Sequence, residues 1–476
     1  MHPAANVAAS AADAPTAVAA KAAPTDGAEA SPFLPTLSAY GLSRVTGFLP
    51  ELPPLARLPE GYFTPWETTL DRLHGLLLTD RFRAEIDARF PHLDPARLDT
   101  HDVPLMRRAF VVLSLLASAY VWGRHATPSA KAVHPDPRRV LPPQLAVPLT
   151  HVSSVLGLRP IVCYAGLDLW NWTPVDPADG CHLDNLTTLH TFSGTMDEAW
   201  FYLIPVGIEA KGAPSLAWMC DAWRAIAQGD HHTVAQIVAR FAALVKGHGQ
   251  CGHRVLRSGA DHAQRARHVP AANFTTVLRA RGGNDLSALD QTSAGPDSRS
   301  PMIQALDVFF GIEHRPTGKG PGPNFIPEMR EYMPREHRAF LDDAQFRAPS
   351  LRDFVANSQH EGLVEAFNAA VAELRAFRTA HLNMVARFII VPAHQHAARA
   401  GTSPPKRVRS TPGSPARNAI VMPQVQSPTK AAEATPGMRG TGGTQLMPFL
   451  KQARDETDAA VVPQLPRQLN GRTDGN

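Results

Sequence analysis

The sequence is poor in cysteine: only four of its 476 residues are cysteines, at positions 163, 181, 220 and 251. So few cysteines exclude a disulfide-stapled scaffold and suit a reducing compartment. A strong charge of one sign is also missing, because 47 basic residues are balanced by 43 acidic ones and the net charge is +4. This balance gives no electrostatic reason to expect nucleic acid or a membrane as a partner.

Long apolar runs are missing as well. The longest run, residues 109–122, is shorter than the about 20 residues that cross a bilayer, so it predicts a buried helix. The N-terminal segment has no basic stretch followed by an apolar core, which argues against a secretory signal. Asp13, Asp26 and Glu29, with no arginine before Arg44, argue against a mitochondrial presequence. We therefore expect a cytoplasmic protein.

Extended alternation of apolar and polar residues, the pattern of strands, is the third absence, and it excludes a sheet as the main architecture. Apolar residues recur instead every three or four positions, as on the buried side of a helix, around 66–78, 103–122, 217–228, 232–248 and 302–312. A further helix is expected to begin near Asp197 and to end near Gly212, because glycine is common just past a helix end. The sequence predicts an all-α fold.

Composition divides the chain into six segments. Residues 1–36 are rich in Ala and Pro and predict a disordered tail, and residues 397–437 predict a disordered insertion. The remaining segments are a small helical domain, a large helical domain, a Gly-rich loop with the C-terminal helix of the large domain, and a second tail: 37–195, 196–396, 438–458 and 459–476.

One long amphipathic helix is predicted between Ser358 and Pro392. Ser358 followed by Glu361 is the pattern of a capping box, and Pro392 is a stop signal. On the apolar side of this helix lies His381, with Arg378 almost one turn before it. Such a histidine can be a hydrogen-bonded core residue, or it can be an axial ligand to haem iron with the arginine near a haem propionate. Spacing alone leaves both interpretations open.

Several segments of the sequence decide between these two interpretations of His381. RTAHLNMVARFIIVPA from Arg378, PEMREYMPREHRAFL before it and GTGGTQLMPFLK after it resemble the C-terminal half of the indoleamine 2,3-dioxygenase family. The resemblance extends backward, in the order of the family, through SAG, FTTVLR, FYLIPVGIEA and YAGLDLWNW and covers residues 37 to about 455. It implies a two-lobed helical haem dioxygenase fold.

The resemblance implies one haem b per chain, ferrous in the active state, with His381 as the axial ligand of its iron. Arg378 stands where the family contacts a haem propionate, and Asp307 stands where an acidic residue pairs with that arginine. Asp307 and Arg378 could also form an ordinary surface ion pair. A buried pair is favoured because an unpaired buried charge would be costly. Gly295 matches a loop on the distal side of the haem.

The substrate pocket is likewise assigned by resemblance. Arg279 stands where the family holds the substrate carboxylate, and its planar fork suits a bidentate contact; the alternative is a solvated arginine at a helix end. Phe274, Phe201 and Tyr164 correspond to aromatic walls of the pocket, although each could instead be a core residue. Ser293 and Ala294 correspond to a loop of small residues over the distal haem, and Thr441 corresponds to a residue near the substrate ammonium.

Some residues depart from the family pattern. Pro205 replaces a serine that many relatives place toward the distal haem, and Leu167 and Asp168 replace small or apolar residues of the pocket wall. If Asp168 faces the pocket, it would change substrate preference. The loop after Gly295 is also longer than usual.

The resemblance implies an enzyme that opens the indole ring of L-tryptophan, and of other indoleamines, with O2 to give N-formylkynurenine, the first step of the kynurenine pathway. No residue acts as catalytic acid or base, an electron donor reduces ferric haem, and the chain is expected to be a monomer. The alternative is a haem protein of this fold that binds or senses O2 without oxidising tryptophan. Arg279 and Phe274 favour the enzyme, whereas Pro205 and Asp168 keep the alternative open. A haem-free helical scaffold would require His381 to be merely structural.

Overall fold

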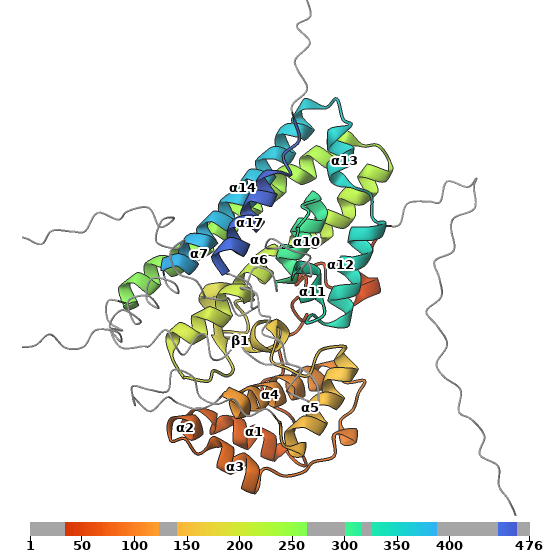
Figure 1. Cartoon of the computed structure of the whole chain (residues 1–476). Helices are drawn as coiled ribbons and strands as arrows, with labels where there is room; N and C mark the ends of the chain where they lie inside the picture. Colours follow the sequence, from red (N-terminus) through yellow and green to blue (C-terminus); the bar gives the residue numbers. More distant parts are fainter. Residues whose placement is uncertain (1–33, 123–139, 264–299, 317–324, 388–445, 464–476) are drawn as a thin grey trace, which may run out of the picture. The chain divides into compact units, whose positions relative to one another are not determined.

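Helices make up most of the structure, a computed structural model that describes residues 34–122, 140–263, 300–316, 325–387 and 446–463 (Figure 1). The helices of the N-terminal part are α1 (Thr64–Asp71), α2 (Leu73–Leu78), α3 (Phe82–Arg89), α4 (Val103–Trp122) and α5 (Pro143–Leu156), with short turns η1 (Leu37–Tyr40), η2 (Pro95–Arg97), η3 (Ala165–Leu169) and η4 (Leu183–Asn185). The helices that follow are α6 (Met196–Ala227), α7 (His231–Ala263), α10 (Pro301–Phe310), α11 (Phe325–Arg330), α12 (Arg335–Arg347), α13 (Leu351–Ala356), α14 (Glu361–Val385) and α17 (Leu446–Asp458).

The predicted all-α class is confirmed. Within the described residues, the strands are limited to β1 (Trp172–Pro174) and β2 (Leu186–Thr188), which pair antiparallel with Trp172 opposite Thr188. A ribbon of this size is a local connection and is too short to organise a core.

The most apolar helix, α4, forms the centre of one hydrophobic core. It packs against α1, α3, α5 and η3, and Phe110, Leu113 and Leu116 are fully buried. The stretch Val103–Val121 is long and apolar enough to cross a membrane, but 78% of its most apolar window is buried inside the protein. The predicted buried helix is therefore confirmed as a core helix.

A buried ion pair ties α1 to α4. Arg108 donates from Nε and Nη2 to the two carboxylate oxygens of Glu67, at 2.8 and 2.5 Å, and both side chains are almost fully buried. Glu67 also accepts from the backbone N–H of Leu58 at 2.8 Å. Nη2 of Arg108 lies 2.9 Å from Nε2 of His190. Burial and the charge of Arg108 lower the pKa of His190 to about 4, so this imidazole is neutral and accepts the bond.

The second core forms around α6, α7, α10, α12 and α14. Its centre is aromatic: Phe241 stacks on Phe309 with ring centroids 4.8 Å apart, and Phe310 meets Phe367 edge to face at 5.6 Å. Helix α14 packs along both α7 and α17 (Figure 1). These contacts bury the stripe of α14 that carries Arg378 and His381.

Helix α6 differs from the sequence prediction. It continues without interruption past Gly212 to Ala227, so the predicted helix end near Gly212 is wrong. A Cβ at Gly212 would lie 2.7 Å from Cγ of Met302. The glycine is therefore needed for the close approach of α10 and does not mark a helix end.

The start of α14 also differs. Its N-cap is His360, whose ring nitrogen Nδ1 accepts from the N–H of Leu363 at 3.1 Å, so the predicted Ser358–Glu361 capping box is wrong. Ser358 instead accepts from the N–H of His360 at 3.1 Å and contacts His231. The predicted stop at Pro392 lies outside the described residues.

The described residues belong to one compact unit. The division into a small and a large helical domain near residue 196 therefore stays a prediction. The predicted tail 1–36 lies outside the described residues except for 34–36, and the predicted insertion 397–437 lies entirely outside them. Of the predicted tail 459–476, residues 459–463 are described, and there Ala460 and Val462 are buried in the second core.

Candidate cofactor and substrate site

The predicted iron ligand and its companion arginine lie on the buried side of α14. His381 is 6% exposed and Arg378 is 5% exposed. Residues three positions apart in a helix lie on the same side, so the two side chains neighbour each other. One turn further on, Val385 joins a small apolar cluster formed by α11, α14 and α17 with Met329, Ile326, Phe449 and Leu450.

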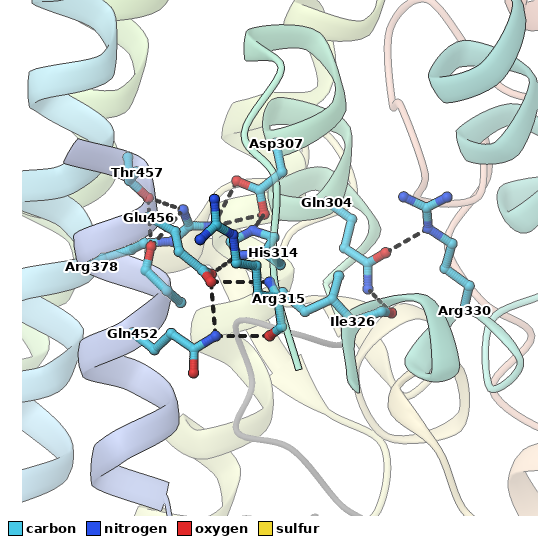
Figure 2. A network of polar contacts seen from close by, with 11 residues as sticks. Gln304, Asp307, His314, Arg315, Ile326, Arg330, Arg378, Gln452, Glu456 and Thr457 are labelled. Carbon is cyan, nitrogen blue, oxygen red and sulfur yellow. Dashed lines mark hydrogen bonds and ion pairs between the residues drawn. The ribbon is translucent and has the colours of Figure 1, made fainter. Parts of the chain in front are cut away.

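Arg378 pairs with Asp307 of α10. Its Nη2 lies 2.7 Å from both carboxylate oxygens of Asp307, and its Nη1 donates to the hydroxyl of Thr457 on α17 (Figure 2). Because both partners are almost fully buried, the alternative of a surface ion pair is wrong. The pair fixes the guanidinium between three helices, α10, α14 and α17.

Two further charges complete this network, and sequence reasoning missed both. His314 lies 3.0 Å from Asp307 through Nε2 and 2.8 Å from Glu456 of α17 through Nδ1 (Figure 2). Burial alone would lower the pKa of His314, but the two carboxylates outweigh it and raise this pKa. Burial acts to raise the pKa of Asp307, yet the charges of Arg378 and His314 hold it below its ordinary value. The ring of His314 is therefore an imidazolium that donates to both carboxylates.

This arrangement predicts a pH-dependent stability. A histidine whose pKa is raised by folding stabilises the fold fully below its unfolded pKa of about 6.5, and this contribution is lost as pH rises through the raised pKa. We expect His314→Gln to lower the free energy of unfolding by about 2 kcal/mol near pH 6, and by less at higher pH. Urea unfolding of both proteins between about pH 6 and 10 measures the difference.

The exposed His92→Gln is the matched control, because the same substitution there breaks no buried contact. It should change the free energy of unfolding by less than about 0.5 kcal/mol at every pH. A loss for His314→Gln that is constant with pH would contradict the charged state assigned to His314.

A cavity lies beside the network. Its lining combines four apolar side chains with an amide and the charged pair: Ile326, Phe449, Leu450, Ala453, Gln304, Asp307 and Arg378.

The residue types at the site fit a haem. Apolar side chains beside a buried arginine suit a porphyrin with its propionates, and the imidazole of His381 lies on the same buried stripe of α14 as that arginine. Among the described side chains, no group of three or more His, Cys, Asp or Glu could hold a metal ion.

The predicted aromatic walls come from η3 and α6. Tyr164 caps the π-helical turn η3, is 5% exposed, and donates from its hydroxyl to Oε1 of Glu209 at 3.0 Å. Phe201 lies half-buried on α6, and its ring centroid is 6.1 Å from that of Tyr202. Burial, with the nearby charges of Glu209 and Asp168, raises the pKa of Tyr164 well above its ordinary value, so the phenol stays protonated.

The structure also shows where the residues that depart from the family pattern lie. Pro205 lies inside α6, and the helix continues through it. Leu167 and Asp168 are both buried in the π-helical turn η3. Turns of this kind are frequent at functional sites. The remaining predicted site residues lie outside the described residues: Phe274, Arg279, Ser293, Ala294, Gly295 and Thr441.

The chain as a whole is similar to known proteins of one family. Residues 36–460 match the family model described as Indoleamine 2,3-dioxygenase. The chain is 31% identical to indoleamine 2,3-dioxygenase nanC of Aspergillus nanangensis over 453 residues, and the aligned region covers 90% of this chain and 98% of that protein. It is 32% identical over 464 residues to indoleamine 2,3-dioxygenase of Saccharomyces cerevisiae, with 90% and 94% covered.

Relatives differ in the substrate that their names state. A 6-hydroxytryptophan 2,3-dioxygenase of Fusarium equiseti is 28% identical over 431 residues, which cover 88% of this chain and 96% of that protein. The family as a whole acts on tryptophan-like substrates with O2 and generally depends on haem. The family match spans most of this chain and includes every predicted site residue. This chain therefore belongs to the indoleamine 2,3-dioxygenase family and is a dioxygenase of tryptophan catabolism.

Proposed function

We propose that this enzyme cleaves the C2–C3 bond of the indole ring of L-tryptophan, and of other indoleamines, with O2 to give N-formylkynurenine, the first step of the kynurenine pathway. The observation that carries the proposal is the buried His381, one helical turn from the Asp307–Arg378 pair at an apolar cavity, in a chain of this family.

In this proposal His381 would ligate the iron of one haem b per chain. Arg378, held by Asp307, would bind a haem propionate, and Gly295 would leave room for O2 and substrate. When bound in the ferrous state, the haem supplies the activation of O2. No acid or base from the protein is required. The protein contributes binding and orientation, which place the indole ring in an apolar site that excludes water.

The substrate is held at two ends. Arg279 grips its carboxylate through two parallel hydrogen bonds, and Thr441 lies near its ammonium group. Phe274, Phe201 and Tyr164 pack against the indole, and Ser293 and Ala294 keep the distal loop small. Because aromatic walls bind any indole while a bidentate arginine requires a carboxylate, this pocket favours amino acids over plain amines.

The second candidate is a haem protein of the same family that binds or senses O2 without oxidising tryptophan. Pro205 favours it, because this residue removes a hydroxyl that many relatives place at the distal side. The wider setting is also proposed: a cytoplasmic monomer that receives electrons from a cellular donor and has no nucleic-acid or membrane partner.

The test is a steady-state assay with haem-loaded protein, L-tryptophan, O2 and a reductant, in which N-formylkynurenine is measured. We expect Arg279→Ala to lower kcat/KM for tryptophan by about 100-fold, since one charge-assisted bidentate contact is lost. Haem content should not change.

Arg281→Ala, two residues away, is the matched control and should retain kcat/KM within about twofold. Unchanged kinetics in Arg279→Ala would remove this residue from the pocket. A normal haem spectrum without any product in the wild-type protein would favour the O2-binding alternative.

A further inference from the structure

A fully buried carboxylic acid lies next to the predicted pocket wall, and the mechanism above does not use it. Glu209 of α6 is 0% exposed. Its Oε1 accepts a hydrogen bond of 3.0 Å from the hydroxyl of Tyr164 and one of 2.6 Å from the hydroxyl of Ser300. Its Oε2 is buried and has no hydrogen-bond partner among the described residues.

Each contact of Glu209 reaches a different element. Tyr164 is the cap of η3 and, in the proposed function, a wall of the tryptophan pocket. Ser300 is the N-cap of α10 and accepts from the N–H of Ile303 at 3.2 Å. Seven residues later, α10 carries Asp307, the partner of Arg378. One carboxyl group therefore connects α6, the pocket wall and the helix that orients the cofactor arginine.

The two oxygens of Glu209 are hydrogen-bonded unequally, and this affects how readily the carboxyl group loses its proton. An ionised carboxylate with one bare oxygen in an apolar interior is poorly solvated. Burial therefore raises the pKa of Glu209 to about 7, although hydrogen bonds from Ser300, Tyr164 and the backbone of Met302 act to lower it. The group is thus part protonated and part ionised at neutral pH.

Within the described parts of the chain, the groups that act on Glu209 come from η3 and α10. η3 contributes the phenol of Tyr164, with Asp168 acting on the same phenol, and α10 contributes the hydroxyl of Ser300 and the backbone of Met302. Charged groups on neighbouring elements are engaged elsewhere: Asp307 with Arg378, Arg352 with the carbonyls of Gly311 and Ala459, and Lys211 with the carbonyl of Gly247.

We propose that Glu209 is a positioning residue for the dioxygenase reaction: its carboxyl group ties Tyr164 to the start of α10, and its proton occupancy sets how firmly the phenol is held against the substrate. This rests on the proposed function, since it takes Tyr164 as a wall of the tryptophan pocket. A charged acceptor forms roughly twice as strong a hydrogen bond as a neutral one. The pocket wall is therefore held more firmly when Glu209 is ionised.

The experiment compares wild-type enzyme with Glu209→Gln, both haem-loaded, between about pH 6 and 8. Glutamine keeps an acceptor for Tyr164 and Ser300 but cannot ionise, so it imitates the protonated acid at every pH. We expect KM for L-tryptophan in the wild type to fall about fivefold from pH 6 to 8, with a smaller change in kcat. Glu209→Gln should show the high KM throughout.

Glu198→Gln is the matched control. Glu198 is another buried glutamate of α6, and it bonds Tyr202 and the backbone N–H groups of Phe192 and Ser193 without contacting Tyr164. This variant should keep the pH dependence of the wild type. If Glu209→Gln keeps it as well, Glu209 is only structural and the proposal is overturned.

A second readout needs no turnover. Difference infrared spectra of the haem-loaded protein without substrate report the carbonyl band of a protonated carboxyl group, and we expect a band that titrates near pH 7 and is missing in Glu209→Gln. Tyr164→Phe removes a donor to the ionised form and should move the midpoint to higher pH. A wild type that shows this titration but makes no product would defeat the proposed function alone. Absence of a titrating band would defeat the role of Glu209 whatever the activity.

Discussion

The His381→Ala variant is expected to fold and to purify without the absorption bands of haem. In the proposed site this imidazole would ligate the iron, so its removal would leave the porphyrin with apolar contacts and the contact of Arg378 with a propionate. His381 is buried on the stripe that packs α14 into the protein, and truncation there costs stability of about 1 to 3 kcal/mol. The measurement is haem per chain from the Soret absorbance, together with the helical circular dichroism signal.

A second variant separates ligation from packing. His381→Gly leaves space for free imidazole, and added imidazole should restore the haem absorbance if the lost group is a ligand. Asn383→Ala, at an exposed position two residues further along α14, is the control and should retain full haem. Undiminished Soret absorbance in His381→Ala would overturn the axial assignment and return His381 to the core histidine that spacing alone allowed.

The second large effect concerns Asp307. Its removal leaves Arg378 without its carboxylate and takes one of the two acidic partners of His314, and both cations are buried. Breaking a buried pair by removing one partner costs about 3 to 5 kcal/mol, because an uncompensated charge remains. We expect Asp307→Ala to lower the free energy of unfolding, measured by chemical unfolding, by an amount in this range and to hold haem less tightly. Asp307→Asn, which keeps the shape of the side chain, should lower the free energy of unfolding by less.

The chain offers a matched control for this prediction. Asp458 of α17 pairs with Arg375 of α14 at 3.1 Å, but both side chains are about half exposed. Surface pairs are worth about 0 to 1 kcal/mol, so Asp458→Ala should have a small effect. Equal losses in Asp307→Ala and Asp458→Ala would show that the buried pair does not organise the site.

The sequence predicted features that depend on neighbouring residues. The periodicity of apolar residues located α4 and most of α14, and it placed His381 and Arg378 on one side of a helix. The pairing of Asp307 with Arg378 came from family resemblance, since residues 71 positions apart share no local pattern.

The missed features are contacts between distant segments. His314 and Glu456 are 142 positions apart, and no spacing rule joins them. Gly212 resembled a helix end because the side chain that requires it, Met302, comes from another helix. Glu209 could have been found: it continues the stripe of Tyr202, Val206 and Ala213 at helical spacing, and all four are buried. A carboxyl group on such a stripe is a signal of function.

The substrate side of the proposed site was predicted from the resemblance of short segments to the family, because no spacing rule joins its residues: Arg279, Phe274, Ser293, Ala294 and Thr441. Asp168, buried beside Tyr164, affects the electrostatics of the pocket wall through the phenol. Comparing tryptophan with a hydroxylated tryptophan as substrate would show how far this departure changes preference.

The most direct test of the central claim is the mass of the product formed from L-tryptophan under 18O2. A dioxygenase inserts both atoms of one O2 molecule across the C2–C3 bond, so the account predicts N-formylkynurenine that carries two 18O atoms in the initial product. Haem-loaded protein that yields no ring-opened product, or a product whose second oxygen comes from water, would contradict it.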